Sequence, residues 1–257
     1  MRHAVHTIGP VLERPDAATP PSNIAVELTT AQALAPLRER YRHEMQCQIV
    51  RDSFVRRGFS HCYGIQADGH LVGYGLVDHR FDPGTVHEFF VAPPYRGWAG
   101  SMFRSLLEAG DGRHIRTQTN DPLLLLMFHD CATNITVENV LFGDALTTAL
   151  ACPGGSLQRK TGDEEEWHVV VDGEIAALAG LLFHYNPPFA DVYMEVNEPF
   201  RRRGYGSYAV QEVKRVAYEL GKVPAARCNP DNLASRRTLE RAGLLPCGHV
   251  LRGDVVR

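Results

Sequence analysis

Three consecutive arginines and two closely spaced glycines form the part of this chain best suited to chemistry. Residues 201–203 are all arginine, and Gly204 and Gly206 follow them. The extended run Asp191–Glu195 precedes this stretch, and apolar residues at helical spacing continue from Ala209 to Leu220. Glycines allow positive φ and close approach to an anion, and N–H groups at a helix N-terminus can hold a phosphate. The spacing therefore predicts a phosphate-binding loop between a strand and a helix, although an ordinary turn with solvated arginines fits the same residues.

A second motif downstream makes the pattern more specific. Arg201-x-x-Gly204-x-Gly206 after a hydrophobic strand resembles the acetyl-CoA signature of the GNAT superfamily of N-acetyltransferases. That family's second motif is matched by Asn232, Ser235, Glu240, Gly243 and Leu244. The resemblance covers roughly residues 157–257. It implies an α/β fold (α+β in its mixed sheet), in which helices flank a central, mostly antiparallel sheet.

The resemblance also implies acetyl-CoA as co-substrate and no metal. In the family, the strand before the loop pairs with the pantetheine arm of the co-substrate, and the N–H groups of the loop cradle the pyrophosphate. The residues that take these roles here by resemblance are Met194, Glu195, Val196, Arg201, Arg202, Arg203, Gly204, Tyr205, Gly206, Ser207, Asn232, Ser235 and Arg236. The histidines show no ligand spacing such as H-E-x-x-H, and we expect no metal site.

Acetyl transfer to an amine requires a base that takes the ammonium proton. Asp191, Tyr193 and Glu195 share one face of the predicted strand because side chains alternate along it. Glu195 is the first candidate, since it lies beside the expected thioester; a solvated carboxylate is the alternative interpretation. His184 is the second candidate, and lining the site is the alternative interpretation for it.

The general acid is missing from its usual place. Many members of the family carry a tyrosine seven positions after the motif asparagine, where it protonates the departing thiolate. This chain has Leu239 there. Tyr193, Tyr205, Tyr208 or a water molecule are the substitutes that the sequence leaves open.

Part of the sequence repeats at a shift of about 105 residues. Matching positions are Gly75-Leu76 with Gly180-Leu181, His79 with His184, Pro83 with Pro188, and residues 91–96 with 196–201. The repeat predicts two GNAT-like domains in tandem. Their expected limits are residues 1–22 for a flexible tail, 23–150 for a degenerate first domain, 151–156 for a linker and 157–257 for the acetyl-CoA-binding domain.

The two copies differ where the chemistry is expected. The first has Ala99 and Ser101 in place of the two glycines, and alanine reaches positive φ only at a cost. The second copy lacks the family's first strand and two early helices, with residues 163–166 expected to form a solvated loop. We therefore expect one CoA per chain, bound at residues 201–207, while the first domain supplies the missing wall of the acceptor site.

Local patterns place the elements of the first half. Apolar spacing predicts a helix over Ala31–Met45 with Thr30 as its N-cap, and a second helix over 46–58. Asp68-Gly69 and Asp172-Gly173 are signals for two-residue hairpins. The segment Val137–Leu141 is expected to be the last strand of the first domain.

Bulk properties restrict the partners. The net charge of -3 gives no reason to expect nucleic acid or an anionic membrane as a partner. No apolar run reaches the roughly 18–20 residues that span a bilayer, and the N-terminus lacks the apolar segment of a signal peptide. Six scattered cysteines without a C-x-x-C pair favour a cytoplasmic protein with reduced thiols.

Two functions remain open at this level. The first is an N-acetyltransferase, a monomer or homodimer, that transfers acetyl directly to an amine of a small molecule or to a protein N-terminus. The alternative is a non-catalytic module on the same scaffold that binds CoA or a protein partner. The intact glycines favour the first function, and Leu239 favours the second.

Overall fold

A computed structural model describes residues 20–45, 48–49, 52–152, 154–162 and 165–256. Most of the predicted tail lies outside these residues. The elements of the first half are β1 Ile24–Thr29, α1 Ala35–Glu44, α2 Asp52–Arg56, β2 Ser60–Ala67, β3 His70–Asp78, β4 Thr85–Val91, η1 Pro93–Trp98, α3 Ala99–Ala109, β5 His114–Gln118, α4 Pro122–Cys131 and β6 Ala132–Asp144. Those of the second half are β7 Gly155–Arg159, β8 Glu166–Val171, β9 Glu174–Leu182, β10 Phe189–Val196, η2 Glu198–Phe200, α5 Tyr205–Glu219, β11 Val223–Cys228, α6 Leu233–Arg241 and β12 Leu244–Val255.

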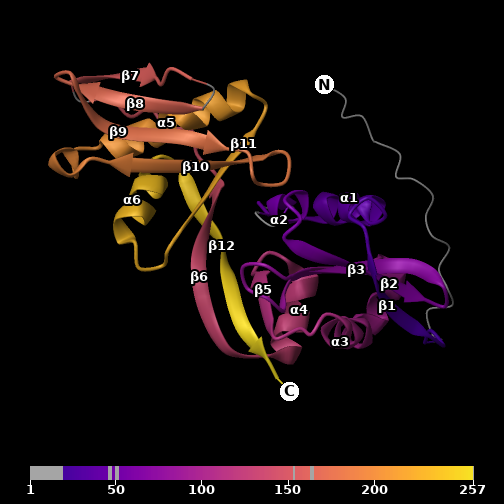
Figure 1. The fold of residues 1–257 in the computed structure, drawn as a ribbon. Helices are drawn as coiled ribbons and strands as arrows, with labels where there is room; N and C mark the ends of the chain where they lie inside the picture. Colours follow the sequence, from indigo (N-terminus) through magenta and orange to yellow (C-terminus); the bar gives the residue numbers. More distant parts are fainter. Residues whose placement is uncertain (1–19, 46–47, 50–51, 153, 163–164, 257) are drawn as a thin grey trace.

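All the strands of the described chain form one sheet that runs through both halves (Figure 1). Its order is β1-β2-β3-β4-β5-β12-β6-β11-β10-β9-β8-β7, mostly antiparallel as predicted. β12, the last strand of the second half, lies between β5 and β6 of the first. β6, the last strand of the first half, reaches β11 of the second. Each half therefore completes its sheet with the other's last strand, an exchange that the sequence did not predict.

The first half has helices on both faces of its sheet. Leu106 of α3 and Phe128 of α4 are fully buried in a core with Phe89 of β4. Leu37 and Tyr41 of α1 bury the opposite face. α1 begins at Ala35, later than predicted, because Thr30 caps the preceding turn by accepting from the Ala33 N–H (3.1 Å). The predicted second helix is also shorter, since α2 spans only Asp52–Arg56.

Both predicted hairpin turns are confirmed. Asp68 and Gly69 have φ of 49° and 82°, and Asp172 and Gly173 have 50° and 82°. These positive values are those of a two-residue turn whose twist matches the flanking strands. The turns join β2 to β3 and β8 to β9, and they set the register of both outer sheet segments.

The second half has its helices on one face only. α5 and α6 pack on a core that includes Val213 and Leu239. The prediction that this half lacks a first strand is wrong, because β7 pairs antiparallel with β8 at the sheet edge and contains two residues of the predicted linker, Gly155 and Ser156. No helix lies between β7 and β8 among the residues described there.

Glu166 is not part of a solvated loop as predicted. It begins β8 and is buried. Hydrogen bonds from His168, Tyr193 and Lys160 lower the pKa of its carboxyl to about 2. The Glu166 carboxylate therefore links β8 to β10 through hydrogen bonds and does not lie in a loop.

The sequence repeat aligns β3 with β9 one residue away from the alignment that the strand pairing gives. Val91 pairs with Gly73, whereas Val196 pairs with Ala177. Gly75 therefore corresponds to Ala179 and not to Gly180. A Cβ on Gly75 would meet Leu106 of α3, whereas one on Gly180 would meet the Tyr193 hydroxyl. The two glycines face opposite sides of the sheet, as a one-residue slip requires.

The connection between α1 and α2 contacts the second half. The Ile49 N–H donates to Asn186 Oδ1, and the Asn186 N–H donates to the Ile49 carbonyl (3.3 Å). Gln48 Nε2 donates to the carbonyls of Phe142 (3.3 Å) and Ala226 (3.2 Å). First-half residues thus lie against the face of the second half that carries no helix of its own.

Candidate functional site

The strands of the second half separate at one point. β10 and β11 run parallel and pair only from Phe189–Val223 to Asp191–Ala225. Beyond Asp191, β10 stays paired with β9 through Val196, and β11 stays paired with β6. The backbone of Met194–Val196 therefore has an edge that no strand covers, which suits the expected pairing with an extended ligand.

The predicted loop leads from this opening into α5. After η2, Arg202 has φ of 64° and Gly204 has φ of 93°, both left-handed. Gly204 is the N-cap of α5, and the Tyr208 N–H is bonded to its carbonyl (3.1 Å). The N–H groups of the first turn come before the helix ladder begins and cannot find partners within it. This is the arrangement that holds a phosphate.

The prediction of positive φ holds for Gly204 but is wrong for Gly206. Gly206 is a buried helical residue inside α5. A Cβ there would lie 2.9 Å from Val196 Cγ2 and 3.2 Å from Thr238 Cγ2. The second glycine is therefore needed because α5 packs closely against β10 and α6, not because of its backbone conformation.

The arginines around the loop have different tasks. Arg201 Nε donates to the Val196 carbonyl (3.2 Å), and the Arg203 guanidinium lies over the Phe200 ring, 5.8 Å from its centroid. Arg241, at the end of α6, reaches the loop, since its guanidinium lies 3.9 Å from where a Cβ on Gly204 would be. Sequence reasoning missed Arg241, because only the packing of α6 beside α5 brings it there.

The second motif builds the start of α6. Asn232 is its N-cap and accepts from the Ser235 N–H (3.0 Å). Leu239, at the family's tyrosine position, is buried in the second-half core. Tyr205 is also buried, and Tyr208 packs against that core near Cys152. Neither position favours Tyr205 or Tyr208 as the general acid.

The predicted catalytic residues have unequal surroundings. His184 Nε2 lies 2.9 Å from Asp191 Oδ2, an ion-pair distance without the alignment of a hydrogen bond. The Tyr193 hydroxyl donates to Glu166 Oε2 (2.8 Å). The Glu195 side chain is exposed. The structure therefore joins His184 to Asp191 at the opening of β10 and β11, while Tyr193 is engaged elsewhere.

Asp191 was placed on the right face by its position in the strand but was given no role. Its side chain is only 10% exposed. Burial raises the pKa of the neighbouring Tyr185 hydroxyl well above its ordinary value, and the charge of Asp191 adds to this effect. The signal that could have found Asp191 is a carboxylate at a strand start, a short turn away from a histidine.

The first-half loop has the same entry but a different helix start. Arg96 Nε donates to the Val91 carbonyl (2.9 Å), as Arg201 does to Val196. However, η1 runs directly into α3, and Ala99 has helical φ of −55° and ψ of −38°. The expected strain at Ala99 is therefore absent, since the backbone needs no positive φ there. At this point the first half has helical backbone, whereas the second half has a turn with left-handed residues before α5.

A hollow in the first half lies where β4 and β5 separate. It has a volume of about 250 Å³, is partly open to solvent, and has walls that include Phe89, Phe90, Leu123 and Leu126. An ion pair between Arg96 and Glu44 and a hydrogen bond from the Tyr41 hydroxyl to Asp121 Oδ2 (2.8 Å) lie along it. Contacts within the protein therefore occupy its polar groups.

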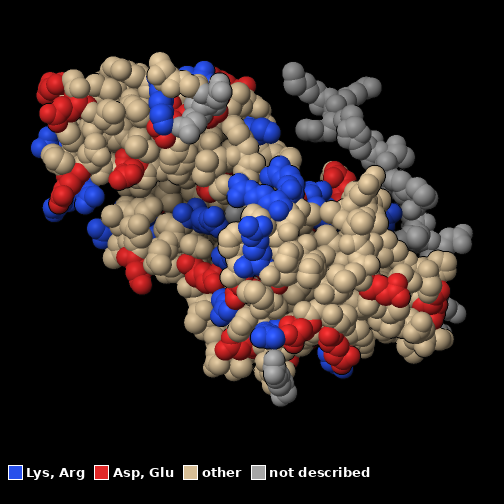
Figure 2. All heavy atoms as spheres, in the orientation of Figure 1, with Lys and Arg blue, Asp and Glu red and all other residues tan. Residues whose placement is uncertain are grey.

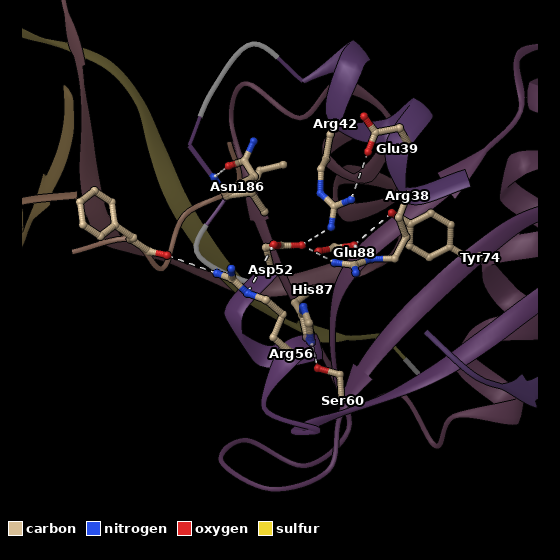
Figure 3. A network of polar contacts seen from close by, with 12 residues as sticks. Arg38, Glu39, Arg42, Asp52, Arg56, Ser60, Tyr74, His87, Glu88 and Asn186 are labelled. Atoms are coloured by element: carbon tan, nitrogen blue, oxygen red, sulfur yellow. Dashed lines mark hydrogen bonds and ion pairs between the residues drawn. The ribbon is translucent and has the colours of Figure 1, made fainter. Parts of the chain in front are cut away.

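A buried charge network lies behind this hollow (Figure 3). Arg38 donates to Asp52 Oδ1 (2.7 Å), and its Nε lies 3.6 Å from Glu88 Oε2. The Tyr74 hydroxyl donates to Glu88 Oε2 (3.0 Å), and Arg42 donates to Asp52. Burial raises the pKa of Glu88, against the charge of Arg38. Burial opposes ionisation of Asp52 too, but the hydrogen bond and charge of Arg42 lower its pKa.

Two kinds of feature are absent from the described part of the chain. No group of three or more His, Cys, Asp and Glu side chains is placed to hold a metal ion there. Nor does any helix within it have the length and apolar character that crossing a membrane requires.

Comparisons with known structures agree with this architecture. An acetyltransferase of the GNAT family from Colwellia psychrerythraea is 14% identical, covers 90% of this chain and 100% of its own, and superposes with a TM-score of 0.75. A GCN5-related N-acetyltransferase from Sphaerobacter thermophilus is 14% identical, covering 92% of this chain and 97% of its own, at a TM-score of 0.59. A tandem GNAT protein from the clavulanic acid biosynthesis pathway is 12% identical, covering 90% and 98%, at 0.57. These likenesses show the fold.

Sequence profiles match both halves. The profile described as Acetyltransferase (GNAT) domain matches residues 31–145, and the profile described as Acetyltransferase (GNAT) family matches residues 143–244. No curated protein shows a significant match to the sequence. The two profiles together span most of the chain and meet at β6, so this protein belongs to the GNAT acetyltransferase family and carries two GNAT domains in tandem.

Proposed function

We propose that this protein is an acetyl-CoA-dependent N-acetyltransferase that transfers acetyl directly to an amine and binds its co-substrate in the second half. The observation that carries this proposal is the left-handed N-cap Gly204 beside the uncovered edge of Met194–Val196. Its first-half counterpart, Ala99, is helical. The tight packing of Gly206 on Val196 keeps the start of α5 against the opening, as a pyrophosphate cradle requires.

The amine is placed on the face opposite α5, beside His184 and Asp191. With Nε2 facing Asp191, the other ring nitrogen of His184 takes the proton from the ammonium group. Asp191 then stabilises the imidazolium and holds the ring in position. The acceptor is a small amine or a protein N-terminus. Gln48 and Ile49 of the first half close this side.

Replacing His184 by glutamine is expected to lower turnover about a hundredfold, because a general base contributes roughly that much. Affinity for acetyl-CoA is expected to stay unchanged, since the ring lies away from the 201–207 loop. Thiol release under saturating acetyl-CoA measures the first quantity, and calorimetry measures the second.

Glu195→Gln is the matched comparison, because Glu195 was the base favoured by strand position. Its exposed side chain leads us to expect a small effect. A hundredfold loss of turnover in Glu195→Gln, with wild-type turnover in His184→Gln, would contradict this assignment. Glu195 would then be the general base.

A non-catalytic module is the second candidate. It is favoured by Leu239, which fills the family's tyrosine position with a core residue. Mass spectrometry of co-purified CoA or acetyl-CoA, followed by an amine panel with thiol detection, separates the two. Bound CoA without turnover on any amine would favour the module.

A further inference from the structure

Arg227 occupies the middle of β11 and faces the proposed amine site. Its neighbours Ala226 and Cys228 are buried in the core under α5, so Arg227 points to the other face of the sheet. Asp191 pairs with Ala225, two residues before it, and therefore shares that face. Arg227 thus lies one strand across from the carboxylate that holds His184.

Within the part of the chain that the structure describes, Arg227 makes no ion pair, and its charge acts on the Tyr185 hydroxyl, where it opposes the rise in pKa caused by burial. Arg227 borders a closely packed crevice at the domain junction that has no room for a water molecule and is lined by Gln48, Arg116, Tyr185 and other residues of both halves. At the other side of this crevice, Arg116 Nε lies 2.6 Å from Glu138 Oε2. Arg227 is half-buried yet makes no ion pair or hydrogen bond with any described residue.

The surroundings of this crevice favour an anion. Figure 2 shows Lys and Arg side chains gathered where the two halves meet, over α2. Asp191, the carboxylate on the same face, is already engaged by His184. Keeping the partly desolvated Arg227 guanidinium without an ion-pair partner costs free energy. An anionic ligand group beside Arg227 would therefore be stabilised. The planar guanidinium binds carboxylates through two parallel hydrogen bonds.

We propose that the acceptor is an amino acid or a similar small molecule, whose carboxylate is bound by Arg227 while its amine lies beside His184 and Asp191. This inference rests on the acetyltransferase function proposed above. Neighbouring strands and two residues of rise place the Cα atoms of Asp191 and Arg227 about 8 Å apart. From this spacing, the side chains of Asp191 and Arg227 can both reach one small molecule whose amine and carboxylate are only a few bonds apart.

The test compares acceptors that differ in one group. The full-length protein is assayed by thiol release with α-amino acids, the amines that lack their carboxylate, their carboxamides, and the aminophosphonates of the same carbon skeleton. Calorimetry without any acceptor measures acetyl-CoA affinity separately. Calorimetry of the same compounds on CoA-loaded protein measures acceptor binding without turnover. The variants are Arg227→Met, Arg227→Lys and, as a control, Arg104→Met, which changes an exposed residue of α3.

Wild-type protein is expected to prefer at least one amino acid over its decarboxylated amine by about thirtyfold or more in kcat/KM. Arg227→Met is expected to abolish this preference by raising KM for the amino acid. Its affinity for acetyl-CoA is expected to equal that of wild type. Arg227→Lys is expected to keep part of the preference, because it keeps the charge without the fork. Arg104→Met is expected to behave like wild type.

Three results would overturn the proposal. One is that acceptors with and without the carboxylate bind equally well and are acetylated equally fast across the whole panel. Another is a preference that persists in Arg227→Met. The third is a phosphonate preferred over the carboxylate. Loss of acetyl-CoA binding in the acceptor-free experiment is a different result, since it would contradict the acetyltransferase function itself.

Discussion

Glutamate in place of Gly204 is expected to reduce acetyl-CoA affinity by about a hundredfold or more. The new carboxylate would stand at the N-terminus of α5, where the helix otherwise favours an anionic ligand. It would also lie near the Arg241 guanidinium and neutralise it. Calorimetry on folded protein, checked by circular dichroism, measures the loss.

Two controls separate charge from backbone strain. Gly204→Ala imposes a side chain at φ of 93° without a charge, at a cost of about 1–2 kcal/mol. Gly97→Glu places the same carboxylate in the exposed loop of the first half, where a Cβ meets nothing within 4 Å. Both are expected to bind acetyl-CoA far better than Gly204→Glu. A hundredfold loss of affinity in Gly97→Glu, with full affinity in Gly204→Glu, would instead place the acetyl-CoA site in the first half.

Arg38→Met is expected to destabilise the protein by about 3–5 kcal/mol, the usual cost of leaving a buried charge unpaired. The substitution removes the Arg38 ion pair of buried Glu88 and leaves Arg42 and Arg56 as the ion-pair partners of Asp52. Urea unfolding, followed by fluorescence and circular dichroism, measures the free energy. Arg40→Met on the same helix is the control, because Arg40 is in no ion pair among the described residues, and it is expected to stay within about 0.5 kcal/mol.

The pH dependence of this loss has a defined sign. The pKa of Glu88 is already raised in the folded protein, so its protonated form is the one that folding favours. Removing Arg38 removes an opposing charge and raises that pKa further. The unfolded state is the same for both proteins, so the stability difference is expected to grow as the pH rises through the raised folded pKa of Glu88 in wild type, to level off above the still higher pKa in the variant, and to shrink at lower pH.

A second substitution tests the cause. In Arg38→Met/Glu88→Gln no carboxylate remains at the Glu88 position, so part of the lost stability is expected to return. A double variant as unstable as the sum of the two single variants would mean that Arg38 acts through packing and not through Glu88.

Local signals were enough to predict the turns. Asp-Gly pairs predicted the two hairpins, and Gly204 was predicted as a left-handed residue at a helix start, because these residues tolerate the conformation directly. Gly206 could not be interpreted in the same way. Its reason is the distance between α5, β10 and Thr238 of α6, which no local pattern expresses.

Long-range pairing limited what could be foreseen about the site. His184 was identified from its position near the turn, but the contact with Asp191 depends on how that turn folds back on β10. Arg227 belongs to none of the motifs described in the sequence analysis. Its significance depends on Tyr185 and Gln48, which come from a distant turn and from the other half.

The exchange of β6 and β12 has a consequence for biosynthesis. The gap beside β5 is filled by residues 244–255, which are synthesised after every other strand of the described sheet. Although amino-terminal domains usually fold first during synthesis, the first half here must wait for the final strand before its sheet is complete. Contacts that span so much of the chain also slow folding. We therefore expect the two halves to complete their folding together once β12 has been synthesised, and to unfold in a single transition as one cooperative unit.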